Sequence, residues 1–230
     1  MMYLLHGAVG SWRDWLPFRE TLESLGQEWS LVDLWREPRI SLEEWGTDFS
    51  RRAEPDSLLV GYSLGGRLAL HALLAEASPF RAGLIISAHP GLPSPAERSE
   101  RGRSDQAWAE KARSLSWTEF LGAWSAQGVL AGQVEPSDRE ALEPEREAIA
   151  ASFENWSLGQ QADLRPQLAR CAKPLLWLTG ERDGKFTRLG QELAGPLVEH
   201  RVLSKSGHRV PWEAPQGFSD ELVAFAKGSA

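Results

Sequence analysis

The chain has 230 residues, 42% hydrophobic and 25% charged, as in a globular protein with a substantial core. Its formal net charge of -7 argues against general binding of nucleic acid or anionic membranes, since either requires a basic surface. Cys171 is the single cysteine, which excludes an intramolecular disulfide and a cysteine-based zinc site. The sequence contains neither a basic leader nor a run near the ~20 apolar residues of a membrane span. We therefore expect a cytoplasmic location and no metal or cofactor.

The first third of the chain alternates apolar runs with helical patterns. Strands are predicted over 2–5, 29–34, from about 57 to 62, and 82–87, with helices over 12–25, 41–52 and from 68 to 74. Ser41 and Glu44 have the spacing of a capping box at the start of the second helix. Uninterrupted apolar strands separated by helices predict an α/β fold with a mostly parallel, doubly wound sheet.

The pattern changes between residues 89 and 163. Strand-like runs vanish, and helical segments are predicted over 95–115, 116–127 and 137–153. The sheet then resumes with strands at 173–179 and 198–203, a helix around 189–194 and a closing helix at 215–227. A helical block inserted between strands is typical of a cap over the carboxyl ends of a sheet. We predict a core of residues 1–88 and 164–230 with a cap of residues 89–163.

A Gly-x-Ser-x-Gly sequence lies between an apolar strand and a helix-forming run, with Gly61, Ser63 and Gly65 as its fixed residues. This is the context of a nucleophile elbow, where a serine sits on a strained strand-to-helix turn between small residues. The alternative is an ordinary glycine-rich turn, which the flanking strand and helix disfavour.

A serine hydroxyl needs an imidazole within hydrogen-bond reach and a carboxylate to orient that imidazole. Elbow enzymes carry the acid and then the histidine after the serine, in loops that follow the last strands. Asp183 and His208 meet this order, whereas Glu181 and His200 lie closer to strands and are weaker candidates. The remaining histidines precede the acid: His6, His71 and His89.

A glycine-rich loop after the first strand, starting at His6-Gly7, is suited to supply one backbone N–H of an oxyanion hole. The residue after the serine supplies the other, which nominates Ala8 and Leu64. Taken alone, the loop is equally compatible with a plain strand-to-helix turn.

Basic residues suggest an anionic ligand. Arg67 follows Ser63 by about one helical turn, on a helix predicted to be buried, where a charge is unexpected unless an anion meets it. Further basic residues cluster in the predicted cap: Arg98, Arg101, Arg103, Lys111 and Arg113. Most of this cluster is compatible with a solvated helix that pairs with nearby acidic residues. Arg67 is thus the stronger indication of a substrate with several carboxylates.

The elbow 61–67 resembles that of the 2-succinyl-6-hydroxy-2,4-cyclohexadiene-1-carboxylate (SHCHC) synthases of menaquinone biosynthesis, the MenH family of the α/β-hydrolase fold. Further segments resemble blocks of the same family: 89–92, 96–98, 100–101, 103–105 with Trp108, 180–183, 185–186 and 207–208. The similarity runs from about residue 57 to the end of the chain. It implies an α/β-hydrolase fold, here with reduced N-terminal strands.

The resemblance implies that Ser63, Asp183 and His208 form the triad, with Ala8 and Leu64 as oxyanion donors. Positions that contact the substrate in the family match Tyr62, Arg67, Arg98, Arg101 and Trp124. The implied reaction eliminates pyruvate from 2-succinyl-5-enolpyruvyl-6-hydroxy-3-cyclohexene-1-carboxylate, a small multi-carboxylate substrate, with the activated serine as general base. The alternatives are a carboxylesterase or carbon–carbon bond hydrolase, and a non-catalytic binding protein, which would require a broken triad.

Overall fold

The computed structural model describes residues 1–36, 40–130, 132 and 134–229. Within these residues six strands form one sheet in the order β2-β1-β3-β4-β5-β6, and each neighbouring pair is parallel. The strands are β1 (Met2–Leu5), β2 (Trp29–Val32), β3 (Ser57–Tyr62), β4 (Phe80–Ile86), β5 (Leu175–Gly180) and β6 (Val198–Leu203). The chain starts in β1, moves outward to β2 and returns to β3 on the other side. The strand order therefore reverses between β1 and β3, where ligands bind in sheets of this type.

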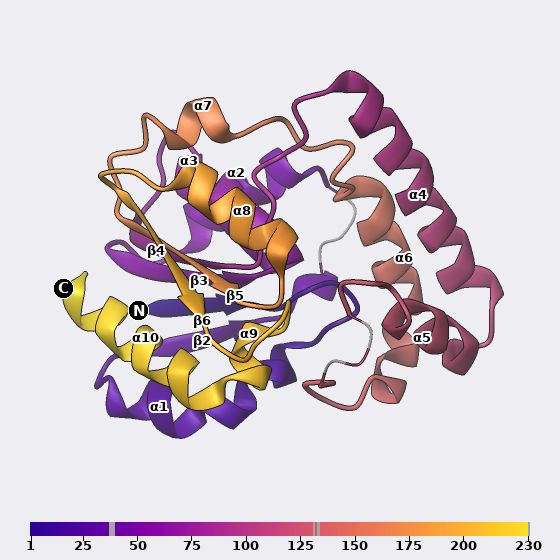
Figure 1. The fold of residues 1–230 in the computed structure, drawn as a ribbon, viewed down its shortest axis with the longest axis horizontal. Coiled ribbons are helices and arrows are strands. Elements are labelled where there is room, and N and C mark those ends of the chain that lie inside the picture. The colour runs from indigo at the N-terminus through magenta and orange to yellow at the C-terminus, as the bar shows by residue number, and fades with distance from the viewer. Residues whose placement is uncertain (37–39, 131, 133, 230) are drawn as a thin grey trace.

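Helices cover both faces of the sheet, which confirms the doubly wound arrangement (Figure 1). Alternate residues of each strand point to opposite faces. Met2 and Leu4 belong to a core with α1 (Arg19–Ser24) and α10 (Pro215–Gly228). Tyr3 and Leu5 belong to a second core with α2 (Leu42–Arg52) and α3 (Leu64–Leu74). The inner strands β1, β3, β4 and β5 are mainly apolar on both faces because both faces are buried, whereas the edge strand β6 contains Glu199, His200 and Arg201.

Several elements begin or end differently from the sequence prediction. The helix expected over 12–25 is a 3₁₀ segment, η1 (Trp12–Phe18), followed by α1, and Pro17 lies where the two meet. The strand expected to reach 34 ends at Val32, before the 3₁₀ segment η2 (Leu34–Arg36). Two short helices were not anticipated, α7 (Arg165–Leu168) and α9 (Val210–Glu213). The capping box at Ser41 is confirmed, because its hydroxyl accepts the Glu44 N–H and its own N–H donates to the Glu44 carboxylate.

The segment between β4 and β5 forms a separate group of helices, α4 (Pro95–Ser114), α5 (Trp117–Ser125), η3 (Glu140–Glu145) and α6 (Arg146–Asn155). The helix predicted over 137–153 is divided into η3 and α6, with Pro144 near the join. Ala109 and Ala112 of α4 and Ala150 of α6 are small buried residues of one apolar cluster, which Ile149 of α6 also joins. Small side chains let the two helices pack closely.

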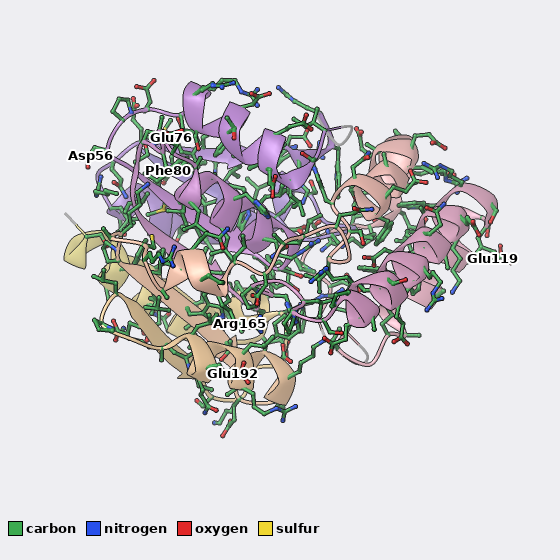
Figure 2. All side chains as sticks on the ribbon, turned by 90° about the horizontal axis from the view of Figure 1, so that it is seen from above. Asp56, Glu76, Phe80, Glu119, Arg165 and Glu192 are labelled. Atoms are coloured by element: carbon green, nitrogen blue, oxygen red, sulfur yellow. The ribbon has the colours of Figure 1, made fainter. Side chains whose placement is uncertain are left out.

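This helical group lies beyond one end of the sheet. In Figure 1, β1 runs from the N-terminus toward α4, α5 and α6, so the group faces the carboxyl ends of the parallel strands. Figure 2 shows Glu119 of α5 at one extremity of the molecule and Asp56, Glu76 and Phe80 toward the opposite one. Within the described residues, no helix combines the length and apolar character that crossing a bilayer requires.

Candidate active site

Ser63 occupies the turn between β3 and α3 with φ 51° and ψ -109°, in a region that residues with side chains rarely adopt. The two glycines of the motif are required by close backbone contacts. A Cβ atom on Gly61 would lie 2.5 Å from the Gly65 carbonyl oxygen, and one on Gly65 would lie 2.4 Å from the His6 carbonyl oxygen. The strained strand–turn–helix geometry expected from the sequence is therefore present around Ser63.

The candidate triad residues lie together at the carboxyl ends of three strands. His208, which follows β6, has Nε2 3.2 Å from Ser63 Oγ and Nδ1 2.7 Å from Asp183 Oδ2. Asp183 follows β5 and also caps α8 (Gly184–Leu193). A carboxylate can only accept, so Nδ1 carries the proton and Nε2 is free to accept the serine hydroxyl proton. This is the arrangement that general-base activation of a hydroxyl requires.

The two competing residues lie elsewhere. The carboxylate of Glu181 is exposed and accepts the Lys205 N–H at 3.0 Å. His200 is in β6, and its Nε2 is 2.8 Å from Thr179 Oγ1. In the part of the chain that the structure describes, neither forms a hydrogen bond with Ser63 or His208, so the geometry distinguishes them from Asp183 and His208.

The proposed oxyanion donors, Ala8 and Leu64, line the same cavity as Ser63. His6 orients the first of them. Its Nε2 accepts the Leu34 N–H at 3.2 Å, so Nδ1 carries the proton and donates to the Gly7 carbonyl at 2.9 Å. Because a trans peptide directs its C=O and N–H oppositely, this bond turns the Ala8 N–H away from His6. Complete burial lowers the pKa of His6 to about 4, which keeps the imidazole neutral.

A cavity of about 250 Å³, here called the central cavity, lies between the sheet and the helical group. Its floor includes the backbone around Ser63, and α4 and α6 contribute to its opposite wall. Aromatic rings line it, contributed by Trp108, Trp124, Phe153, Trp156 and Phe186. Its basic residues are Arg67, Arg101, Arg139, Lys185 and Arg209, whereas the acidic ones are Asp14 and Asp105. The cavity can thus enclose an anion that also has an apolar ring.

Arg67 carries a buried charge that no carboxylate of the described residues pairs with directly. Its side chain lies in the wall of the cavity, and the residue is 9% exposed. Nη2 donates to the Trp156 carbonyl at 2.6 Å and Nη1 to Gln161 Oε1 at 3.2 Å, both neutral acceptors. Burial, and secondly the charge of Arg101, lowers the pKa of Arg67 to about 9. The carboxylate of Asp105 opposes this shift but pairs with Arg101, and across the described residues Arg67 forms no ion pair, so an anionic ligand would add a direct partner.

The two cap arginines behave differently. Arg101 lines the cavity and pairs with Asp105 at 2.8 Å, and Asp105 also accepts the Ser157 hydroxyl at 2.7 Å. Arg98 is not among the residues that line the cavity. Its Nη1 donates to the carbonyls of Leu92 at 2.8 Å and Pro93 at 3.0 Å, which fastens the loop before α4. The structure therefore brings Arg101 but not Arg98 to Ser63's cavity.

The two aromatic candidates both line the cavity. Tyr62 packs its ring between His208 and Trp212, with centroids 5.7 Å and 4.9 Å away, and burial raises the pKa of its hydroxyl. Trp124 packs against Trp108 and Phe153, each with a centroid separation of 5.2 Å. Tyr62 thus borders the candidate triad. Trp124 is the contribution of α5 to an aromatic wall that also includes Trp108 of α4 and Phe153 of α6.

Sequence reasoning missed a set of ion pairs at the edge of the cavity. Arg139 forms two bonds with the buried carboxylate of Asp14, at 2.8 Å and 3.1 Å. Arg209, next to His208, pairs with Glu135 at 2.9 Å. These contacts attach the segment before η3 to the core beside the candidate triad. Asp14 and Arg139 are 125 residues apart, so no local pattern could have revealed the pair.

The chain is similar in sequence and in fold to known proteins. Residues 2–221 match the alpha/beta hydrolase family. A protein of Salmonella paratyphi C named 2-succinyl-6-hydroxy-2,4-cyclohexadiene-1-carboxylate synthase is 34% identical over 253 residues, covering 98% of this chain and 93% of the relative. The structure of MenH from S. aureus has a TM-score of 0.83 at 23% identity, over 99% of this chain and 93% of that one. Carboxylesterase CesB from Bacillus subtilis has a TM-score of 0.68 at 19% identity, over 99% and 83%.

Proposed function

Because the chain belongs to the alpha/beta hydrolase family, and within it to the SHCHC synthases, we propose that it is a lyase of menaquinone biosynthesis. It eliminates pyruvate from 2-succinyl-5-enolpyruvyl-6-hydroxy-3-cyclohexene-1-carboxylate and yields SHCHC. The observation that carries the proposal is the position of Ser63, 3.2 Å from His208 Nε2, in a cavity where the buried Arg67 has no carboxylate partner. A proton acceptor and a cation without a direct ion pair suit deprotonation of an anionic substrate.

In this reaction Ser63 is the base. His208 accepts the serine proton at Nε2, and Asp183 stabilises the resulting imidazolium through Nδ1. The serine oxygen removes a proton from one ring carbon, and the electrons of that C–H bond form a new ring C=C bond. The existing C=C bond shifts by one position, the bond between a second ring carbon and the enolpyruvyl oxygen breaks, and enolpyruvate leaves. The ring proton restores the serine hydroxyl, and the proton held by His208 Nε2 passes to the departing enolpyruvate, which ends as pyruvate. No bond forms between Ser63 and the substrate, so water is not consumed.

The backbone N–H groups of Ala8 and Leu64 stabilise the enolate-like oxygen that develops as the proton leaves. His6 supports this role by holding the Gly7 carbonyl at 2.9 Å, which fixes the direction of the following N–H. A donor that is already oriented requires no reorganisation during the reaction.

The substrate carries three carboxylates, and the cavity offers cations for them. We assign Arg67 and Arg101 to carboxylate binding, with Tyr62 and Trp124 contacting the ring or its substituents. Arg98 is left out of this set, because its guanidinium is engaged by the Leu92 and Pro93 carbonyls outside the cavity lining. Residues 89–163 act as the cap that closes over the substrate, and a cytoplasmic location remains a prediction.

The second candidate function is hydrolysis of an ester or a carbon–carbon bond. The same triad spacing and the same N–H donors would serve a tetrahedral intermediate formed by attack of Ser63. The difference lies in the cavity, since a neutral ester would leave the buried charge of Arg67 without a partner.

The test measures pyruvate release from the enolpyruvyl substrate, coupled to lactate dehydrogenase, beside hydrolysis of p-nitrophenyl acetate and butyrate by the same preparation. The proposal predicts a kcat/KM for pyruvate release far above that for either ester. Ester hydrolysis without pyruvate release would establish the hydrolase and overturn the lyase.

A further inference from the structure

His89 lines the central cavity but takes no part in the candidate triad. It follows β4 at the carboxyl end of the sheet, and the residue is only 6% exposed. Its ring lies edge-to-face against Phe186, which in turn packs on His208 with a centroid separation of 4.5 Å. A polar side chain in the cavity wall can bind a ligand through any ring nitrogen that the protein leaves without a partner.

The structure fixes which nitrogen of His89 carries the proton. The Gly91 N–H, which can only donate, lies 3.1 Å from Nδ1, so Nδ1 is an acceptor and the neutral ring has its proton on Nε2. Burial, together with the charges of Lys185, Arg165 and Arg67, lowers the pKa of His89 to about 3. The ring therefore stays neutral at ordinary pH. In the described part of the chain, no protein group accepts the Nε2–H bond.

Gln161 joins His89 to Arg67. This side chain is 1% exposed, donates from Nε2 to the His89 carbonyl at 3.0 Å, and accepts Nη1 of Arg67 at 3.2 Å through Oε1. The loop itself is held by Gly91, whose φ of +117° and contact with the Ala162 carbonyl exclude a side chain. Arg67 and His89 are thus positioned as one unit in the wall of the cavity.

We propose that the His89 Nε2–H and the Arg67 guanidinium form one subsite that binds a carboxylate of the substrate. A hydroxyl would satisfy His89 alone and leave the charge of Arg67 uncompensated, whereas a carboxylate accepts from both. A neutral donor beside Arg67 adds a hydrogen bond without adding to the repulsion between Arg67 and Arg101. This assignment of the substrate's chemistry rests on the proposed function, but the binding of a carboxylate can be measured without it.

Two substitutions of His89 test its Nε2–H donor separately from the hydrogen bond that its Nδ1 accepts from the Gly91 N–H. In His89→Asn the side-chain oxygen can still accept the Gly91 N–H, but no donor reaches the place of Nε2. In His89→Gln the longer amide can place an N–H there. His200→Gln is the matched control, because that residue lies outside the cavity lining and contacts Thr179. The probe is tricarballylate, a simple tricarboxylate, titrated against tryptophan fluorescence, since Trp108, Trp124 and Trp156 line the cavity.

We expect His89→Asn to raise the dissociation constant of tricarballylate about tenfold or more, as for loss of one hydrogen bond to a charged group. His89→Gln should stay within about threefold of the unsubstituted protein, and His200→Gln should match it. Melting temperatures establish that each variant is folded. Equal weakening by Asn and Gln would show that an N–H donor at this place does not restore binding, and would overturn the proposal.

Two other outcomes would also overturn it: unchanged affinity in a folded His89→Asn variant, or no binding of tricarballylate by the unsubstituted protein. Failure of the proposed lyase reaction is a separate result. A chain that binds tricarballylate in a His89-dependent way but releases no pyruvate would retain the subsite and lose the assigned reaction.

Discussion

Replacement of Arg67 by alanine tests the link between the buried charge and the substrate. A guanidinium has five N–H donors, and Arg67 uses two of them on Trp156 and Gln161, which leaves three for a ligand. A hydrogen bond between charged groups contributes about 1.5–3 kcal/mol. We therefore expect Arg67→Ala to cost about 2–4 kcal/mol of transition-state stabilisation, or a fall of about 30-fold to 900-fold in kcat/KM.

The assay is pyruvate release over a range of substrate concentrations, with the melting temperature as a check of folding. Arg67→Lys keeps the charge but loses the planar fork, so its kcat/KM should lie between those of the alanine variant and the unsubstituted protein. Arg98→Ala is the matched control, because Arg98 contacts backbone carbonyls outside the cavity lining, and it should change kcat/KM less than about threefold. A folded Arg67→Ala variant with normal kcat/KM would refute the assignment of Arg67.

Three further predictions concern the reaction centre and the buried histidines. Ser63→Ala should lower kcat for pyruvate release by about 10²–10⁴-fold with a smaller change in KM, and a normal rate would remove Ser63 as the base. His6→Phe should lower kcat by about 10-fold to 100-fold, because the Gly7 carbonyl loses its donor and the Ala8 N–H its orientation; kcat within threefold would contradict this. Burial lowers the pKa of His6 and His71 to about 4 from 6.5, so the unfolded state binds more protons between these values. The free energy of unfolding should therefore be highest above pH 6.5. It should decrease between pH 6.5 and pH 4 by about 3 kcal/mol for each of these two histidines. Urea unfolding at pH 7.5, 6 and 5 measures this, and a flat profile would exclude it.

The inner strands of the sheet were predictable because they are mainly apolar on both faces and contain few residues that favour other structures. Leu58, Leu59 and Val60 of β3, for example, are all completely buried. The first residue of a helix was less predictable where the side chain that caps the helix is also a candidate site residue. Asp183 is a triad candidate and also the N-cap of α8, so that helix begins at Gly184 rather than near the predicted residue 189.

The candidate triad followed from chain order and strand ends, since these rules place Asp183 and His208 at the same edge of the sheet as Ser63. The residues that line the cavity were harder to predict from the sequence. Arg98 and Arg101 lie three positions apart on one helix, yet only Arg101 lines the cavity, because the guanidinium of Arg98 folds back on the loop before α4. Helical spacing alone does not determine where a long side chain ends.

His89 shows a different limit of sequence reasoning. Its position before the acid in the chain excludes it from the triad, but chain order says nothing about substrate contacts. The feature that identifies it is a ring nitrogen without a partner in the described part of the structure, beside a buried arginine. Such a feature depends on the Gly91 N–H and on Gln161, 72 residues away, and becomes visible only in three dimensions.

The central claim is that Ser63 removes a proton and does not attack the substrate. The most direct measurement is the isotope effect on pyruvate release in a single turnover, with the substrate carrying deuterium at the ring carbon that loses its proton. Excess protein isolates the chemical step from product release. We predict clearly slower pyruvate release from the deuterated substrate. Equal rates, together with a substrate adduct on Ser63 in the mass spectrum of the quenched protein, would contradict the account.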